Sequence, residues 1–317
     1  YLRFQAPCND VDGYNNTITM LRTSLENAEK QPMKAYSDSL QATLYGHNPL
    51  RASLKLADLN KANFETIKKL YSERFNAAGD FDFFFTGALN VDSLREFTEQ
   101  YIAPLKGVKK REHYIDLKVE PVQGVVNNHF FRQMETPQAI VVQIYSGKNP
   151  YTMKEAAVVN ALGAVLTQRY LKSIREDAGI AYSVGTDGSA SYGVSDRYSL
   201  VTQCPVKPAQ LDSALLLMKQ GIEDIAKNGV TADELEKVLA FELKDYADNQ
   251  KKNGYWMNLI TEKVVWNKDF RTNYEATLKS ITSKDIQDFV NNVVLKQNNC
   301  ITVSMRPTDM TEKDGVK

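Results

Sequence analysis

The three histidines are the first residues to consider for metal chemistry. A catalytic metal site needs several protein ligands, commonly His and carboxylate side chains on adjacent turns of one helix. His47 stands in Tyr-Gly-His-Asn-Pro, His113 in a charged connector, and His129 in a run that predicts a strand. None has a Glu or a second His at helical spacing, so neither HExxH nor HxxEH occurs. We therefore predict no metal site in this chain and interpret the histidines as structural or solvated.

Other catalytic signatures are also missing from the sequence. There is no GxSxG nucleophile elbow, and Cys8, Cys204 and Cys300 have no histidine nearby in the sequence. The most glycine-rich stretch, residues 185–188, lacks the GxxxxGK[ST] pattern of a phosphate-binding loop. The 39 basic residues balance the 39 acidic residues, which argues against a nucleic-acid partner. No apolar run approaches the roughly 18–20 residues that span a bilayer.

One pair of residues could bind a peptide. Arg175 and Tyr182 lie on either side of Gly179 in Arg-Glu-Asp-Ala-Gly-Ile-Ala-Tyr. A guanidinium donates hydrogen bonds to peptide carbonyls, and a phenol donates one to a carbonyl or oxyanion. An ordinary interpretation also exists, because Arg favours the last turn of a helix, Gly ends a helix, and Tyr is common in strands. The residues alone leave both interpretations open.

The elements around this pair must position it. Apolar residues at spacings of three and four predict a long helix over residues 152–177, which Gly179 ends. Strands are predicted over residues 180–189 and 197–206, with a turn around Tyr192-Gly193 that makes them a hairpin. Arg175 and Tyr182 therefore lie where the helix runs into the hairpin.

The N-terminal part is predicted to be mainly helical. A short strand over residues 1–6 precedes two helices, over residues 14–30 and 32–45. This helical hairpin has no sheet of its own to cover. We interpret residues 1–54 as the end of a preceding α+β domain whose earlier part is absent, and we expect the apolar face of Ile18, Leu21 and Leu25 to be left uncovered by the rest of the chain.

The remainder predicts an α+β domain over residues 55–306, with a mostly antiparallel sheet and helices on one face. Thr231 and Thr282 each begin a helix with a carboxylate three residues later, and Asn228-Gly229 ends another helix. Residues 307–317 are predicted to be a polar tail. The other predicted elements are helices over 61–75 and 91–102, and strands over 81–86, 124–133, 139–146 and 300–305.

Several motifs resemble the pitrilysin/insulinase family of zinc metallopeptidases, the inverzincins. Arg175 and Tyr182, with Gly179 between them, resemble the Arg/Tyr signature of that family. Residues 71–87 (Tyr-Ser-Glu-Arg-Phe-Asn-Ala-Ala-Gly-Asp, then Phe-Asp-Phe-Phe-Phe-Thr-Gly) and the helix after them are similar to the opening of its even-numbered domains. Tyr45-Gly-His-Asn-Pro49 is similar to the segment before that opening, and Asn253-Gly-Tyr-Trp256 to a later helical region of bacterial periplasmic zinc proteases. The resemblance covers nearly the entire chain.

The resemblance implies the C-terminal half of a zinc endopeptidase, with a fold of the LuxS and processing-peptidase type. Zinc would be bound by HxxEH and a distant Glu of an N-terminal half, which is either part of the same polypeptide or a partner chain. The two halves would enclose a peptide or small protein substrate. Arg175 would hold a peptide carbonyl, and Tyr182 would donate to the oxyanion opposite the zinc. This chain alone would bind no zinc and cleave no peptide, and the family resemblance suggests the bacterial cell envelope, in the periplasm.

Two other interpretations are open at this stage. The chain is alternatively a non-catalytic subunit of the same fold that binds a peptide or a partner protein. The second alternative is a stand-alone binding module whose sheet edge captures an extended strand.

Overall fold

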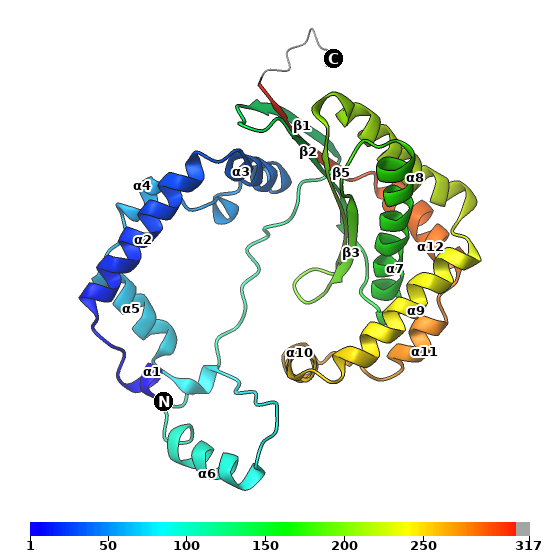
Figure 1. Cartoon of the computed structure of the whole chain (residues 1–317). Helices are drawn as coiled ribbons and strands as arrows, with labels where there is room; N and C mark the ends of the chain where they lie inside the picture. Colours follow the sequence, from blue (N-terminus) through cyan, green and yellow to red (C-terminus); the bar gives the residue numbers. More distant parts are fainter. Residues whose placement is uncertain (109, 309–317) are drawn as a thin grey trace.

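A five-stranded sheet lies at the centre of the molecule (Figure 1). The computed structural model describes residues 1–108 and 110–308. The spatial order of the strands is β1-β5-β2-β4-β3, with β1 and β5 parallel and the other neighbouring pairs antiparallel. This confirms the predicted α+β class with a mostly antiparallel sheet. The strands are β1 Val125–Arg132, β2 Ala139–Lys148, β3 Gly185–Ser191, β4 Arg197–Val206 and β5 Cys300–Pro307.

The burial of each strand explains its place in the sheet. In β5 every residue from Ile301 to Pro307 is buried, as expected of a strand covered on both faces. In β1 exposed and half-buried residues alternate, which suits an edge strand. β5 therefore lies between β1 and β2, although only a turn separates these two strands in the sequence, whereas β3 and β4 form the predicted hairpin.

Helices cover one face of the sheet and enclose the main core (Figure 1). α7 contributes Leu162, Val165 and Leu166, each with 0% of its surface exposed, at the helical spacing that the sequence predicted. Thr231 and Thr282 form the predicted capping boxes. The helices of this part are α7 Met153–Tyr170, α8 Leu211–Asn228, α9 Ala232–Asn249, α10 Asn253–Trp266, α11 Tyr274–Lys279 and α12 Ser283–Phe289.

α3, Pro32–Leu44, packs on the opposite face of the sheet. Its Tyr36 is 3% exposed, packs in a second core with Ile140 and Val303, and donates a hydrogen bond from its hydroxyl to the Val303 carbonyl at 2.9 Å. Helices therefore lie on both faces of the sheet, not on one. The expectation that the N-terminal hairpin has no sheet to cover is wrong for α3, because β2 and β5 present apolar side chains to both faces.

The other N-terminal helices form an arc away from the sheet (Figure 1). They are α2 Val11–Glu29, α4 Leu56–Leu59, α5 Phe64–Phe75 and α6 Val91–Tyr101. The Tyr14 ring of α2 stacks on the Phe64 ring of α5, with 5.1 Å between centroids. α2 has no buried residue, and Leu21 is 38% exposed, so its apolar face is only partly covered. α4 and α5 lie beside α2, α6 lies beyond α1 (Leu2–Gln5) near the N-terminus, and none of these helices lies on the sheet (Figure 1). The boundary after residue 54 stays a prediction.

Two predicted strands of this part are wrong. Residues 1–6 contain a short helix, α1 Leu2–Gln5, and residues 81–86 are extended but pair with no described strand. The Phe81 ring packs instead on the rings of Phe4 and Phe75, with centroids 5.0 and 5.3 Å away. Alternating aromatic residues suit a strand, but a ladder also needs the free edge of a neighbouring strand.

Two remaining expectations concern the membrane and the C-terminal tail. No helix within residues 1–108 and 110–308 is long and apolar enough to cross a membrane. Of the predicted polar tail, residues 307–317, Pro307 ends β5, and the part from residue 309 lies outside the described residues.

Candidate functional site

Arg175 and Tyr182 lie together at the corner between α7 and β3. Arg175 belongs to a π-helical turn, Leu171–Asp177, that continues α7, and Tyr182 lies just before β3. The guanidinium carbon of Arg175 is 5.6 Å from the centroid of the Tyr182 ring, within cation–π range. Tyr182 is 86% exposed, and Arg175 is exposed as well. The structure thus brings together the two residues singled out in the sequence, although the predicted strand that contained Tyr182 begins only at Gly185.

Buried neighbours hold this corner in place. Ile174 and Ile180 are 0% and 4% exposed and belong to the main core, and the Ile180 amide donates a hydrogen bond to the Ile174 carbonyl at 2.9 Å. Gly179 between them has a φ of +64°, in the left-handed region that favours glycine. Arg175 directly follows Ile174, and Tyr182 lies two residues beyond Ile180. Both exposed side chains therefore project from an anchored backbone.

The π-helical turn was not predicted from the sequence, which favoured one regular helix. In this turn the Ala178 amide donates to the carbonyl of Ser173, five residues earlier, at 3.2 Å. One extra residue in a helical turn rotates the side chains that follow by roughly 100° relative to a regular α-helix. The direction of Arg175 therefore depends on this local geometry, which the apolar spacing of α7 does not encode.

The corner offers hydrogen-bond donors to a ligand. Among the described residues, the side chains of Arg175 and Tyr182 form no hydrogen bond and no ion pair, so the guanidinium and the phenol are available to carbonyl oxygens. Lys207 adds a further positive charge, and its ammonium group donates a hydrogen bond to the Gly179 carbonyl at 3.0 Å. The arrangement is suited to bind the backbone of a peptide.

The histidines do not converge on a metal site. His129 lies on β1, where its Nδ1 is 2.6 Å from the Ser304 hydroxyl and burial lowers its pKa. His47 lies in the turn after α3 with a φ of 58°, and His113 is exposed in the connector before β1. In the part of the chain that the structure describes, no three His, Cys, Asp or Glu side chains form a group that could hold a metal ion. These residues therefore do not fit a zinc centre.

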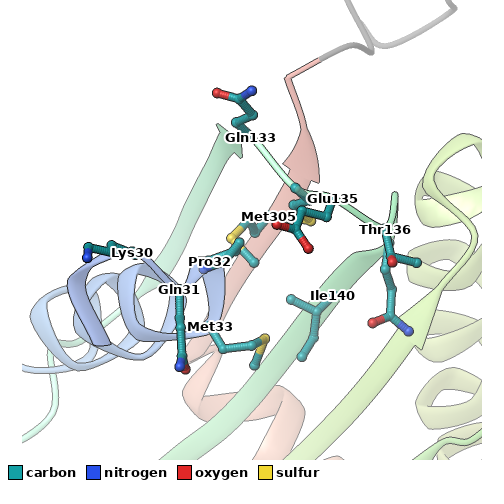
Figure 2. A pocket seen from close by; sticks show the side chains of 11 residues that line it. Lys30, Gln31, Pro32, Met33, Gln133, Glu135, Thr136, Ile140 and Met305 are labelled. Carbon is teal, nitrogen blue, oxygen red and sulfur yellow. The ribbon is translucent and has the colours of Figure 1, made fainter. Parts of the chain in front are cut away.

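A cavity of about 660 Å³ lies between the start of α3 and the sheet (Figure 2). Met33, Ile140 and Met305 provide apolar walls, and Glu135 from the β1–β2 connection lies beside them. None of its lining side chains belongs to the Arg175 corner. The cavity arises from the docking of α3 on the sheet, which the sequence did not predict.

A second cavity, of about 450 Å³, was also missed by sequence reasoning. It lies beside the β3–β4 turn and is lined mainly by aromatic and acidic side chains. Tyr192 and Tyr255 stand in segments singled out in the sequence, but no motif brings the lining residues together, because they come from separate segments of the chain. A weak signal in the sequence is the abundance of tyrosine, with 16 residues. The lining residues are Tyr192, Glu242, Asp245, Tyr246, Asn249, Tyr255, Asn258, Leu259, Glu262, Phe270 and Tyr274.

Solved structures of other proteins share this fold. A protease from Helicobacter pylori superposes with a TM-score of 0.76 at 14% identity, covering 95% of this chain and 73% of that chain. The periplasmic protease PqqL from Escherichia coli superposes with a TM-score of 0.74 at 16% identity, covering 92% of this chain and 33% of that one. At such low identity these similarities establish the fold.

Sequence comparison identifies the family. The probable zinc protease PqqL of Haemophilus influenzae is 22% identical over 166 residues, which make up 51% of this chain and only 17% of that protein. The model of the peptidase M16 inactive domain matches residues 61–241, more than half of the 317 residues. The predicted relation to zinc metallopeptidases is confirmed, and the chain belongs to the family of the peptidase M16 inactive domain.

Proposed function

We propose that this chain is the half of a zinc-dependent endopeptidase that binds no zinc, and that it forms one wall of the substrate chamber and presents Arg175 and Tyr182 to the peptide. One observation carries the proposal. The two side chains contact each other, are exposed, have no other polar partner among the described residues, and project from a backbone anchored by Ile174 and Ile180. Preorganised donors of this kind suit substrate binding.

Each residue has a distinct proposed role. The guanidinium of Arg175 donates to a carbonyl oxygen of the bound peptide and orients the chain. The phenol of Tyr182 donates to the carbonyl oxygen of the peptide bond that is cleaved, where negative charge develops during hydrolysis. The first role stabilises the bound substrate, and the second stabilises the transition state more than the substrate.

The zinc would be held by an N-terminal half, on the same polypeptide or on a partner chain. The names of similar proteins, which include zinc proteases, support this division. The chain by itself would then cleave no peptide. We further propose a periplasmic location, which the description of Escherichia coli PqqL as a periplasmic protease supports. Cell fractionation with an antibody to the native protein tests the location.

The test of function uses the full-length protein and measures steady-state peptide cleavage. Tyr182→Phe removes one donor and almost no volume, so kcat and kcat/KM should fall together by about 10²–10³-fold. Arg175→Ala should act mainly through KM, because it removes a contact made in both the ground state and the transition state. Normal turnover of a folded Tyr182→Phe enzyme would refute the catalytic role.

A matched control separates this effect from a general change of the surface. Tyr114 is 65% exposed in the connector before β1, outside the Arg175 corner. Tyr114→Phe should leave kcat and KM unchanged. Zinc content and the melting temperature should be the same in all three variants.

A further inference from the structure

The second cavity combines aromatic walls with negative charge. It lies where the β3–β4 turn, α9, α10 and the start of α11 meet, and Figure 1 shows α10 next to that turn. Its aromatic side chains contact one another. The Tyr246 and Tyr274 rings are 4.7 Å apart, and the Tyr192 and Phe270 rings are 5.1 Å apart. Such rings present electron-rich faces that attract cations.

Three carboxylates line the same space. Glu242 and Asp245 come from α9, and Glu262 comes from α10. Among the described residues none of the three is in an ion pair, and no Lys or Arg lines the cavity. Oε2 of Glu262 is buried and has no partner within normal hydrogen-bond distance among the described residues, although the Tyr192 phenol lies near enough for Glu262 to affect its pKa. Because a buried carboxylate oxygen without a partner is costly, this cavity is built to receive a donor.

The negative charge of these carboxylates affects the pKa of the neighbouring tyrosines. Burial and then the neighbouring Glu262 raise the pKa of Tyr192 well above its usual value. Burial and then Glu242 and Asp245 raise the pKa of Tyr274. Burial also raises the pKa of Glu242, with a further contribution from Asp245. The three carboxylates therefore affect tyrosines that line the same cavity.

Two cationic side chains of the described part of the chain, Lys268 and Arg271, lie near this cavity without lining it. Lys268 lies 5.6 and 5.9 Å from the ring centroids of Tyr151 and Tyr192, and Arg271 lies 5.1 Å from that of Trp256. Neither side chain lines the cavity or forms an ion pair with its carboxylates. Aromatic rings of this region, including the cavity-lining Tyr192, therefore already lie near cations, while the three carboxylates of the cavity have no ion-pair partner among the described residues.

A metal ion fits these residues poorly. The three carboxylates do not converge closely enough to form a metal-binding group in the described part of the chain. A hard cation also gains little from aromatic walls, because it prefers oxygen ligands on all sides. An organic cation uses both features, since its carbon chain packs on the rings and its charged end meets a carboxylate.

We propose that this cavity binds an alkylammonium group, with the carbon chain between Tyr192, Tyr246 and Tyr274 and the ammonium at Glu262. The group belongs either to a free diamine or to a lysine side chain of a peptide. This inference does not depend on the proposed role of Arg175 and Tyr182.

The test is isothermal titration of the 317-residue chain with cadaverine, a five-carbon diamine. Cadaverine should bind saturably at one site, and 1-pentanol, which lacks the charge, should not bind. Glu262→Gln keeps the shape of the side chain and removes its charge, so it should weaken cadaverine binding about tenfold or more. Tyr192→Leu should also weaken binding, because it removes one ring from the wall.

Two controls exclude indirect effects. Glu236→Gln changes an exposed carboxylate of α9 that does not line the cavity, and it should leave the affinity unchanged. Melting curves of all variants verify that they are folded. Unchanged binding in folded Glu262→Gln protein, or calcium binding that displaces cadaverine, would overturn the proposal.

A second titration distinguishes the two sources of the ammonium group. A Gly-Gly-Lys-Gly-Gly peptide with blocked ends is compared with its Nε-acetylated form. Binding of the unmodified peptide without binding of cadaverine assigns the site to peptide lysine, and binding of cadaverine shows that a free amine suffices. If neither amine binds, or if the acetylated peptide binds equally well, the proposal fails.

Discussion

The helices that cover the sheet and the helices of the N-terminal arc have the same helical spacing of apolar residues. They differ in how deeply those residues are buried. α7 has nine buried residues, including Leu162 and Val165, because it packs between the sheet and the helices α8, α9, α11 and α12. α2, α5 and α6 have no buried residue, although each is amphipathic. Apolar spacing is therefore enough to specify a helix, but burial requires a partner surface.

The largest test of this difference is a pair of leucine truncations. Leu162 is 0% exposed in α7, and Leu70 is 51% exposed in α5. Leu162→Ala should lower the free energy of unfolding by about 2–5 kcal/mol, because it leaves a cavity in a packed core. Leu70→Ala should change it by less than about 1 kcal/mol. Denaturant titrations followed by circular dichroism measure both, and equal effects would mean that the arc has a core of its own.

A second test compares ion pairs in the two regions. Arg169 of α7 bonds both carboxylate oxygens of Glu234, at 2.7 and 2.9 Å, and this hydrogen bonding lowers the pKa of Glu234 to about 2. The pair should contribute about 1–2 kcal/mol, allowing for partial exposure. Because the folded-state pKa is depressed, this stability is present above about pH 4.5 and is lost as the pH falls towards 2.

Glu234→Gln should therefore reduce stability at pH 7 and flatten its decline between pH 4.5 and 2. Glu65 forms a more exposed pair with Lys68 in α5, at 2.8 Å. Glu65→Gln should have almost no effect at either pH. Thermal melts across this pH range provide the measurement, and the same pH profile for both variants would contradict the comparison.

A smaller effect probes α3, which packs on the sheet and also contacts α2. Tyr36→Phe removes the hydrogen bond from α3 to the Val303 carbonyl and should cost about 1 kcal/mol, since a buried hydrogen bond is lost. The matched control is Tyr14→Phe in α2, where the ring stacks on Phe64 and the hydroxyl has no hydrogen bond among the described residues. Its stability should stay within about 0.5 kcal/mol of the parent chain. If Tyr36→Phe were equally silent in urea titrations, α3 would not be docked on the sheet in solution.

The smallest expected effect on stability is at the candidate site itself. Tyr182 is 86% exposed, and its hydroxyl has no hydrogen bond among the described residues. Tyr182→Phe should therefore change the free energy of unfolding by less than about 0.5 kcal/mol. A clear loss of stability in calorimetry would indicate a structural role for this phenol.

Local features of the sequence determined the parts of the structure that depend on neighbouring residues. The capping boxes at Thr231 and Thr282 and the glycine stop at Gly179 all appear as predicted. The sequence also placed Arg175 and Tyr182 close together. Only seven positions separate them, and the end of a helix lies between, so both fall at one corner of the fold. These features follow from backbone geometry over a few residues.

The tertiary structure alone decided which distant segments meet. Tyr36 bonds to Val303 across 267 positions of sequence, β5 lies between β1 and β2, and residues 81–86 lack a strand partner among the described residues. The carboxylates and tyrosines of the second cavity converge in the same way. Strand pairing and cavity walls depend on which surfaces remain free once the whole chain has packed. The residue pattern of one segment does not specify which other segment will pack against it.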